Sequence, residues 1–280
     1  MSEPQQRPPE PRPAATVIVM RDAPDSSPPD IFMVERTAQA SAFGGLFVFP
    51  GGKVDPGDIE LEERCNGLTD AEASARLGIP SGGLAYWIAC IRECFEEAGL
   101  LLGLDSSGAM LNLEGDEAQQ RFGALRAKLN AGEISFAEIC RSEDITLATD
   151  RLAYCSHWIT PEQERRRFDT RFFIAAAPAT QRAVHDGGET VSSRWIDAAS
   201  ALAALAEQRM NMIPPTFMNL RTLVDFADSE AALGHFRSLP EGAIPPITPS
   251  IFKDEDGSLK LRLSPEGPVL DLSQASKVRR

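Results

Sequence analysis

The chain has 280 residues, of which 42% are apolar and 25% charged, and its formal net charge is −13. This composition is that of a chain with a sizeable buried core, so we expect one large domain with extensions. No apolar run approaches the ~20 residues that a bilayer span requires, and the acidic charge excludes nucleic acid as a bulk partner.

The N-terminal quarter predicts a tail, two strands and a glycine turn. Residues 1–13 are proline-rich and polar, which predicts a disordered tail rather than a secretion signal. Apolar, β-branched runs over residues 15–20 and 31–35 predict neighbouring strands. Residues 47–49 then lead into Gly51 and Gly52, which allow a sharp turn and a close backbone approach to a ligand. We therefore predict that this turn contacts substrate.

The next segment predicts a short helix and then a helix rich in glutamate. Thr69-Asp70-Ala71-Glu72 has the form of a capping box. Residues 84–98 have helical periodicity and end at Gly99. Within that helix Glu93, Glu96 and Glu97 share one arc, opposite its apolar residues. Such a cluster is either a solvated charged face or a site for a hard divalent cation, which prefers carboxylate oxygens.

The remaining elements alternate between helices and strands. A helical excursion occupies residues 111–144 and includes a second capping box at Ser135-Phe136-Ala137-Glu138. Strands are expected over residues 154–159, 170–176 and 191–196, and helices over 197–210 and 215–227. We assign residues 14–230 to one domain with insertions at about 59–83 and 105–148, and residues 231–280 to a proline-rich C-terminal extension.

Two separated motifs together resemble the signature of the Nudix hydrolases, which is a glycine, five residues, a glutamate, seven residues and then RE-U-x-EE-x-G-U, where U is a bulky apolar residue. Gly52 matches the first glycine, and Arg92-Glu93-Cys94-Phe95-Glu96-Glu97-Ala98-Gly99-Leu100 matches the second half. Asp58 stands in the place of the first glutamate, and residues 59–91 replace the usual seven. Because loop-closure entropy grows slowly with length, the two halves can still meet.

The split signature is similar to one branch of that family, the coenzyme A diphosphatases. A motif that precedes the signature in that branch is matched in part by Arg36, Gly45 and Phe49-Pro50-Gly51-Gly52. Ser41 replaces its second arginine, which is a natural phosphate ligand. The resemblance implies an α/β fold, an α/β/α sandwich with a mixed sheet, and an enzyme that hydrolyses acid anhydrides of phosphorus with Mg²⁺ or Mn²⁺.

The resemblance also implies roles for individual residues. Glu93, Glu96 and Glu97 would bind metal directly, and Asp58 would reach it through water. Arg92 would hold a glutamate in position, while Arg36, Gly51 and Gly52 would lie on the substrate side. The general base is either one of the signature glutamates or a distant acid, for which Glu189 in a Gly-rich turn is the candidate. The alternative for Glu189 is an ordinary solvated carboxylate.

Two other groups of residues have competing interpretations. The basic run from Arg165 to Arg171, which includes Arg167, would bind the 3′-phosphate of coenzyme A or would only balance the acidic surface. Cys90 and Cys94 are one helical turn apart, a spacing compatible with zinc or redox chemistry, yet buried free thiols in a reducing compartment are the more common case. We therefore expect a cytoplasmic protein.

These interpretations together predict an enzyme that cleaves coenzyme A or acyl-coenzyme A into 3′,5′-ADP and a 4′-phosphopantetheine product. The alternatives are hydrolysis of another nucleoside diphosphate, such as a dinucleotide or a nucleotide sugar, and a catalytically silent nucleotide-binding regulator. The expected partner is a small-molecule diphosphate, with neither nucleic acid nor membrane involved, and a homodimer is left open.

Overall fold

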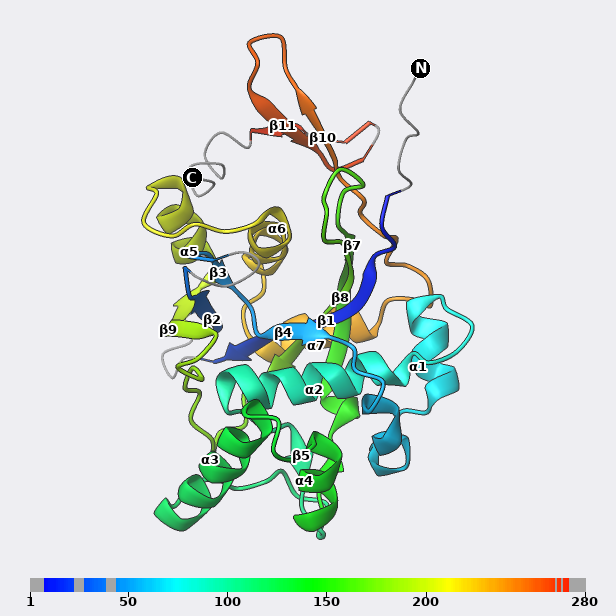
Figure 1. Ribbon diagram of the computed structural model, residues 1–280, viewed down its shortest axis with the longest axis vertical. Coiled ribbons are helices and arrows are strands. Elements are labelled where there is room, and N and C mark those ends of the chain that lie inside the picture. The colour runs from blue at the N-terminus through cyan, green and yellow to red at the C-terminus, as the bar shows by residue number, and fades with distance from the viewer. Residues whose placement is uncertain (1–7, 23–27, 39–43, 265, 268, 272–280) are drawn as a thin grey trace.

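The computed structural model describes residues 8–22, 28–38, 44–264, 266–267 and 269–271 (Figure 1). Ser41 and the first seven residues of the predicted tail lie outside these ranges. Within them, no helix is both long and apolar enough to cross a bilayer. The elements in chain order are β1 (Arg12–Arg21), β2 (Asp30–Arg36), β3 (Phe47–Val48), β4 (Gly51–Lys53), the 3-10 helix η1 (Asp58–Arg64), α1 (Asp70–Leu77), α2 (Leu84–Ala98), β5 (Gly103–Leu104), α3 (Asp116–Asn130), α4 (Phe136–Ser142), β6 (Thr146–Leu147), the 3-10 helix η2 (Thr149–Arg151), β7 (Leu152–Ile159), β8 (Phe168–Ala176), β9 (Thr190–Asp197), α5 (Ala198–Ala206), α6 (Pro214–Leu223), α7 (Ser229–Arg237), β10 (Ser250–Lys253), β11 (Leu259–Arg262) and β12 (Val269–Asp271).

A mixed seven-stranded sheet forms the middle layer of the fold. Its path is β3-β2-β1-β8-β7, with β4 paired to β1 and β9 paired to β2. β1 and β8 run parallel, while the other pairs of this sheet are antiparallel. Gly51 and Gly52, predicted as a turn, instead form β4 and pair with Thr16 and Ala15 of β1. This pairing attaches the glycine segment to the central strand of the sheet.

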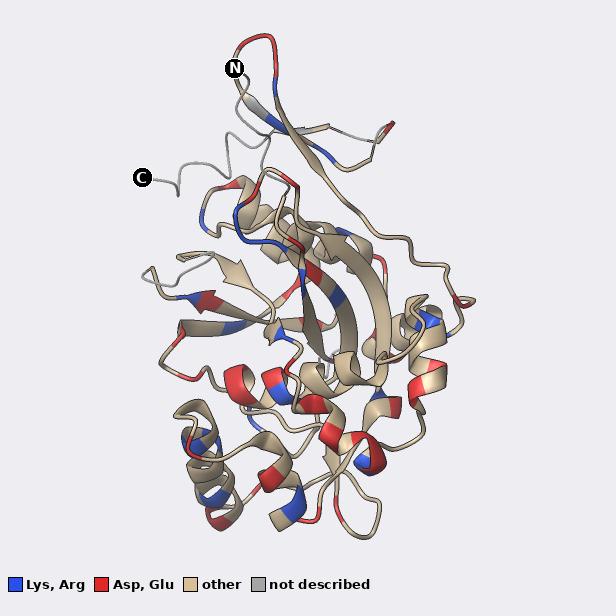
Figure 2. Cartoon of the chain, turned by 45° about the vertical axis from the view of Figure 1, so that its right-hand side comes forward, with Lys and Arg blue, Asp and Glu red and all other residues tan. Residues whose placement is uncertain are grey.

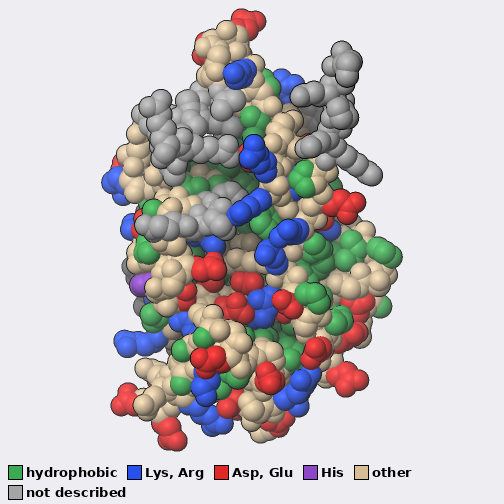
Figure 3. Space-filling model, viewed as in Figure 1, with side chains coloured by type: hydrophobic (Ala, Val, Ile, Leu, Met, Phe, Trp, Pro, Cys, Tyr) green, Lys and Arg blue, Asp and Glu red, His purple; other side chains and the backbone are tan. Residues whose placement is uncertain are grey.

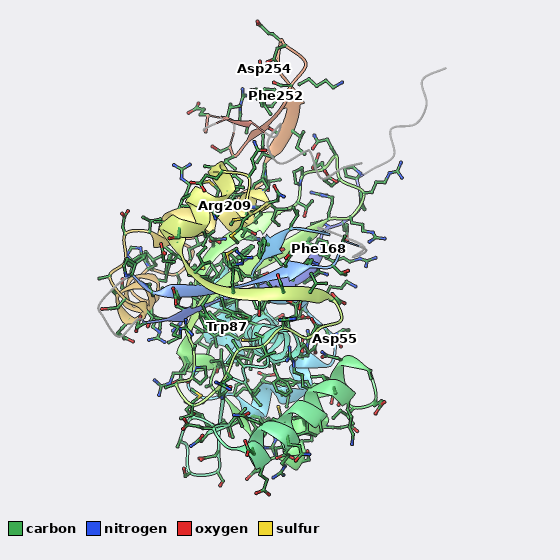
Figure 4. The ribbon with its side chains drawn as sticks, turned by 90° about the vertical axis from the view of Figure 1, so that its left-hand side faces the viewer. Asp55, Trp87, Phe168, Arg209, Phe252 and Asp254 are labelled. Carbon is green, nitrogen blue, oxygen red and sulfur yellow. The ribbon has the colours of Figure 1, made fainter. Side chains whose placement is uncertain are left out.

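Alternating side chains of β1 pack into two different cores. Val17 and Val19 join the core under α2, whereas Ile18 and Met20 join the core under α5, α6 and α7. This alternation is what a strand covered on both faces requires. In Figure 4, Trp87 of α2 lies on one side of the sheet and Arg209, after α5, lies on the other. The predicted α/β/α sandwich with a mixed sheet is confirmed.

Both predicted capping boxes are present and begin short helices inside the insertions. The Thr69 hydroxyl accepts a hydrogen bond from the Glu72 amide at the start of α1, and Ser135 does the same for Glu138 at the start of α4. In each box the glutamate carboxylate also accepts from the capping residue's own amide. Figure 2 shows how acidic residues concentrate on the helices in the lower half of the molecule.

The C-terminal part of the chain differs most from the sequence interpretation. The boundary expected at residue 230 falls inside α7, whose Ala232, Leu233 and Phe236 are buried in the core under α5 and α6. Asp228 caps this helix by accepting from the Ala231 amide. Beyond it, β10, β11 and β12 form a separate three-stranded antiparallel sheet at the top of Figure 1. The segment is therefore structured as well as proline-rich.

Candidate active site

The helix that carries the three glutamates is α2, and residues of the insertions hold both of its ends. At the N-terminus, the Asp70 carboxylate of α1 accepts hydrogen bonds of 2.9 Å from the amides of Gly82 and Leu84. At the C-terminus, Arg126 and Asn130 of α3 donate to the carbonyl of Glu96, at 2.9 and 3.2 Å. Sequence reasoning did not identify these three residues, since nothing in their local pattern shows a contact with another helix.

The end of α2 is fixed by Gly99. Its φ is +70°, in the left-handed region that favours glycine, and its amide donates to the carbonyl of Phe95. A Cβ at this position would also lie 3.0 Å from Arg126 Nη1. The Val184 amide donates to the carbonyl of Ala98, so the final turn of α2 has partners for its carbonyl groups.

The glutamates of α2 are covered rather than displayed to solvent. Glu93 and Glu97 are buried, with 9% and 7% of their surface exposed, and Glu96 is half-buried. The alternative of a solvated charged face does not hold for Glu93 and Glu97. Their side of the helix is covered by β4, because the Gly51 amide donates to Glu97 Oε2 at 3.1 Å and a Cβ on Gly52 would lie 2.3 Å from Glu93 Oε1. Only a glycine at position 52 leaves room for the Glu93 carboxylate.

Burial changes the ionisation of these carboxyl groups. It raises the pKa of Glu97 to about 8, with a further contribution from the charge of Glu93. Burial also raises the pKa of Glu93 to about 7 against the opposing effect of Arg92, and it raises the pKa of Glu96 in the same direction. Buried carboxylates that lie close together bind protons more tightly than a free glutamate does, unless a bound cation replaces the protons.

Arg92 donates hydrogen bonds to acceptors of four residues, one of them in β4. Its Nη1 donates to Glu93 Oε1 at 2.8 Å and to Glu96 Oε1 at 3.2 Å, and its Nη2 donates to the carbonyl of Lys53 at 2.7 Å. Although burial acts to lower its pKa, the hydrogen bond and charge of Asp58 with the charge of Glu93 raise it above the ordinary value. Arg92 thus links α2 to the glycine segment as a permanent cation.

Asp58 pairs with Arg92, which differs from the metal role expected for it. Its Oδ1 accepts from Arg92 Nε at 2.7 Å and its Oδ2 from Arg92 Nη2 at 3.1 Å, and Oδ2 also accepts from the Asp55 amide. Asp58 is 3% exposed. Asp58 is therefore the carboxylate that orients Arg92, and Arg92 in turn contacts Glu93 and Glu96.

Arg36 brings Glu189 to the same place from a distant part of the chain. Arg36 Nη1 contacts Glu97 Oε1 at 3.4 Å, and Arg36 Nη2 donates to Glu189 Oε2 at 2.8 Å. The Glu189 backbone is held by Thr37, whose amide donates to the Glu189 carbonyl, and by Asp186, which accepts from the Glu189 amide. The turn that carries Glu189 is thus attached to the site.

The two other predicted substrate residues have separate positions. Arg171 is 4% exposed, donates to the Leu77 carbonyl at 2.9 Å and pairs with Asp169 at 3.3 Å, so it belongs to the interior and not to the surface where a substrate was expected. Arg167 is half-buried, and its Nε donates to the carbonyl of Thr160 and its Nη1 to that of Pro9. Arg167 is therefore next to the start of β1.

The donor set suits a divalent cation, although no coordination shell is assembled. Among the described residues, no three acid, imidazole or thiol groups already surround one point as metal ligands. The oxygens of Glu93, Glu96 and Glu97 instead face Arg92, Arg36 and the Gly51 amide. These are hard oxygen donors on one helix face, so the residues fit a hard divalent cation after the carboxylates turn from the arginines.

A family model for the NUDT19 Nudix domain matches residues 63–223, which is more than half of the chain. The chain belongs to this family. The matched range contains α2 with its three glutamates and the turn that carries Asp186 and Glu189, but it begins after the glycine segment and after Arg36 and Thr37. The five cysteines of this Nudix domain and its flanking segments, which include Cys90 and Cys94, are all free thiols.

Relatives of known name agree with this membership. The chain is 25% identical to acyl-coenzyme A diphosphatase NUDT19 of Xenopus laevis over 233 residues, which are 71% of this chain and 60% of the frog protein. For the Gallus gallus protein of the same name the identity is 25%, over 95% of this chain and 87% of that protein. The match to the Homo sapiens protein covers 44% of its length at 27% identity. The frog and human matches thus span less than two thirds of those proteins.

A solved structure shares the Nudix fold. The NUDIX hydrolase from Alicyclobacillus acidocaldarius superposes with a TM-score of 0.67 at 23% sequence identity. The superposition covers 80% of this chain and 96% of that one. At this identity the likeness describes the arrangement of the elements and leaves the substrate to be argued from the site.

Proposed function

We propose that the chain is a metal-dependent Nudix diphosphatase that hydrolyses coenzyme A or acyl-coenzyme A to 3′,5′-ADP and a 4′-phosphopantetheine product. The observation that carries this proposal is the burial of Glu93 and Glu97 against Gly51 and Gly52, between Arg36 and Arg92. Substrate class rests on the names of the frog, chicken and human relatives. The five free cysteines support a cytoplasmic or other reducing location.

The residues of the site divide the work of the proposed reaction. Glu93, Glu96 and Glu97 would hold Mg²⁺ or Mn²⁺, which supplies charge neutralisation at the diphosphate and a bound water of lowered pKa. Arg36, freed from Glu97, would turn its guanidinium to a phosphate oxygen. Arg92 would stay paired with Asp58 and keep α2 and β4 in the same relative position while the glutamates turn.

Glu189 is the proposed general base. It lies within reach of the glutamates through Arg36, and its side chain is 70% exposed, so water can reach it. The attacking water would lose its proton to this carboxylate as its oxygen forms a bond to phosphorus, and the bridging P–O bond would break with the electron pair leaving on the departing phosphate. A glutamate of α2 is the alternative acceptor of that proton.

A substrate panel tests the proposal. Purified protein is incubated with coenzyme A, acetyl-coenzyme A, a diadenosine polyphosphate, ADP-ribose and a nucleotide sugar, each with Mg²⁺ or Mn²⁺, in water enriched in ¹⁸O, and products are read by mass. We expect 3′,5′-ADP as one product, with a single ¹⁸O in one of the two products, and none from the Glu97→Gln variant. Preferential cleavage of another diphosphate would move the assignment to the general hydrolase. Turnover of no compound, with nucleotide binding retained, would favour the silent regulator.

A further inference from the structure

A basic cleft lies at the start of β1, separate from the glutamates. It has a volume of about 460 Å³ and is lined by Pro9, Glu10, Arg12, Lys53, Arg165, Arg166, Arg167 and Phe168. Five of these residues are cations and one is an acid. In Figure 3, basic side chains gather on the same face as a group of acidic side chains and directly above it. In a chain of net charge −13, such a local excess of positive charge calls for an explanation.

Backbone pairing brings the cations of this cleft together from three distant segments. Arg12 is paired with Phe168 in the parallel register of β1 and β8, and its amide donates to the carbonyl of Arg167 at 2.9 Å. Lys53 is the partner of Ala14 on the other side of β1. The hairpin loop that carries Arg165 is therefore fixed beside the strand that carries Lys53.

Three of these side chains have no carboxylate partner among the residues that the structure describes. Within the described parts of the chain, Arg12, Lys53 and Arg165 make no ion pair with a carboxylate. All three are exposed, so water and ligands can reach them. Arg167 points two of its nitrogens at carbonyl groups, which orders the cleft. Repulsion among these cations destabilises the folded protein, and a bound anion would reduce that repulsion.

The cleft adjoins the candidate active site through β4. Lys53 directly follows Gly52, where an added Cβ would lie 2.3 Å from Glu93 Oε1, and the carbonyl of Lys53 accepts from Arg92. A molecule with its diphosphate at the glutamates can therefore place another anionic group among the cations. The small volume and the fork geometry of arginine suit one compact dianion better than a polymer.

We propose that this cleft binds a phosphomonoester group that the substrate carries in addition to its diphosphate. The inference rests on the proposed function, and it deepens that function by assigning Arg12, Lys53, Arg165 and Arg167 to the part of a nucleotide distant from the bond that breaks. In coenzyme A this group would be the 3′-phosphate. A substrate that lacks it would lose these contacts and keep those at the glutamates.

The test compares two pairs of compounds in wild-type protein and in the double variant Arg12→Gln/Arg165→Gln. Both side chains are exposed and neither forms an ion pair with a described carboxylate, and the melting temperature checks that the variant folds. The control is Arg221→Gln, an exposed arginine of α6 outside the cleft. The first measurement is the ratio of kcat/KM for coenzyme A to that for its 3′-dephospho form. Because each contact is exposed, we expect the double variant to lower this ratio about threefold to tenfold, mainly through KM.

The second measurement needs no catalysis. Binding of 3′,5′-ADP and of 5′-AMP is measured by calorimetry without metal, and we expect only the wild type and the control to prefer 3′,5′-ADP. A wild type that cleaves coenzyme A with a ratio unchanged in the double variant overturns the cleft assignment. A wild type that cleaves no coenzyme A, yet prefers 3′,5′-ADP through these arginines, overturns the proposed function and leaves the cleft assignment in place. Equal binding of both nucleotides by the wild type overturns the cleft assignment directly.

Discussion

Replacing Gly52 with alanine is expected to disable the site while the fold persists. The added methyl group would lie 2.3 Å from Glu93 Oε1 and 2.5 Å from Glu93 Cδ, well inside van der Waals contact. The backbone at Gly52 cannot move away easily, because it is paired with Ala15 of β1. The Glu93 carboxylate must therefore shift, and with it the oxygen that Arg92 contacts.

Overpacking of this kind costs about 1–3 kcal/mol, which corresponds to about a 5- to 150-fold loss in kcat/KM if it falls on the site. The matched control is Gly57→Ala, in which the nearest atom to the new methyl group is Asp55 Oδ1 at 3.4 Å, an ordinary contact. Hydrolysis of coenzyme A and thermal unfolding are measured for both variants. Activity of Gly52→Ala within twofold of that of Gly57→Ala would refute the argument that the glycine makes room for Glu93.

Three further outcomes are expected from the same geometry. Replacing Glu97 with glutamine should abolish turnover without lowering the melting temperature. Asp58→Asn should lower the melting temperature, because the variant leaves the Arg92 charge poorly paired at a cost of up to about 3–5 kcal/mol. The reverse order of the two melting temperatures would contradict these roles. Asp70→Ala should lower the unfolding free energy, measured with denaturant, by about 1–2 kcal/mol and should reduce activity. An unchanged denaturant midpoint would show that the Asp70 cap does not stabilise α2. The pKa values of Glu93 and Glu97, about 7 and about 8, lie above those of the unfolded chain, so metal-free protein should lose stability as pH rises from about 5 to about 8. The stabilisation by Mn²⁺ should grow over the same range. A constant difference between the melting temperatures with chelator and with Mn²⁺ across that range would be inconsistent with carboxylates that exchange protons for metal.

The local features of the sequence predicted the local structure well. Residues 84–98 form α2 with the predicted ends, since a glycine at its C-terminus and unbroken periodicity define both limits. The capping boxes at Thr69 and Ser135 begin their helices for a similar reason, because all of their hydrogen bonds lie within four residues. Helix α7 was missed although Asp228 supplies a cap, since the surrounding prolines suggested an extended tail.

The parts of the site that depend on distant residues could not be predicted. The pairs Arg92–Asp58 and Arg36–Glu189 are separated by 34 and 153 positions, and no periodicity reports such contacts. The resemblance to the Nudix signature assigned the glutamates and Asp58 to a metal, but a sequence motif does not show that Asp58 pairs with Arg92. Residues 59–83 were assigned only as an insertion, yet Asp70 in that segment caps α2. Shortening the segment would therefore destabilise the start of α2.

A residue of the C-terminal segment pairs with β7 at the edge of the main sheet. Strand β7 is the last strand on the path of the main sheet, and Ile247 forms a parallel bridge with its Trp158. The Ile247 amide donates to the carbonyl of His157, and the Ile247 carbonyl accepts from the amide of Ile159. Prolines at 245, 246 and 249 have no amide hydrogen and so stop the pairing from extending. The segment thus closes an edge that would otherwise invite another chain to pair with it, and a protein shortened at residue 230 would be exposed to aggregation through β7.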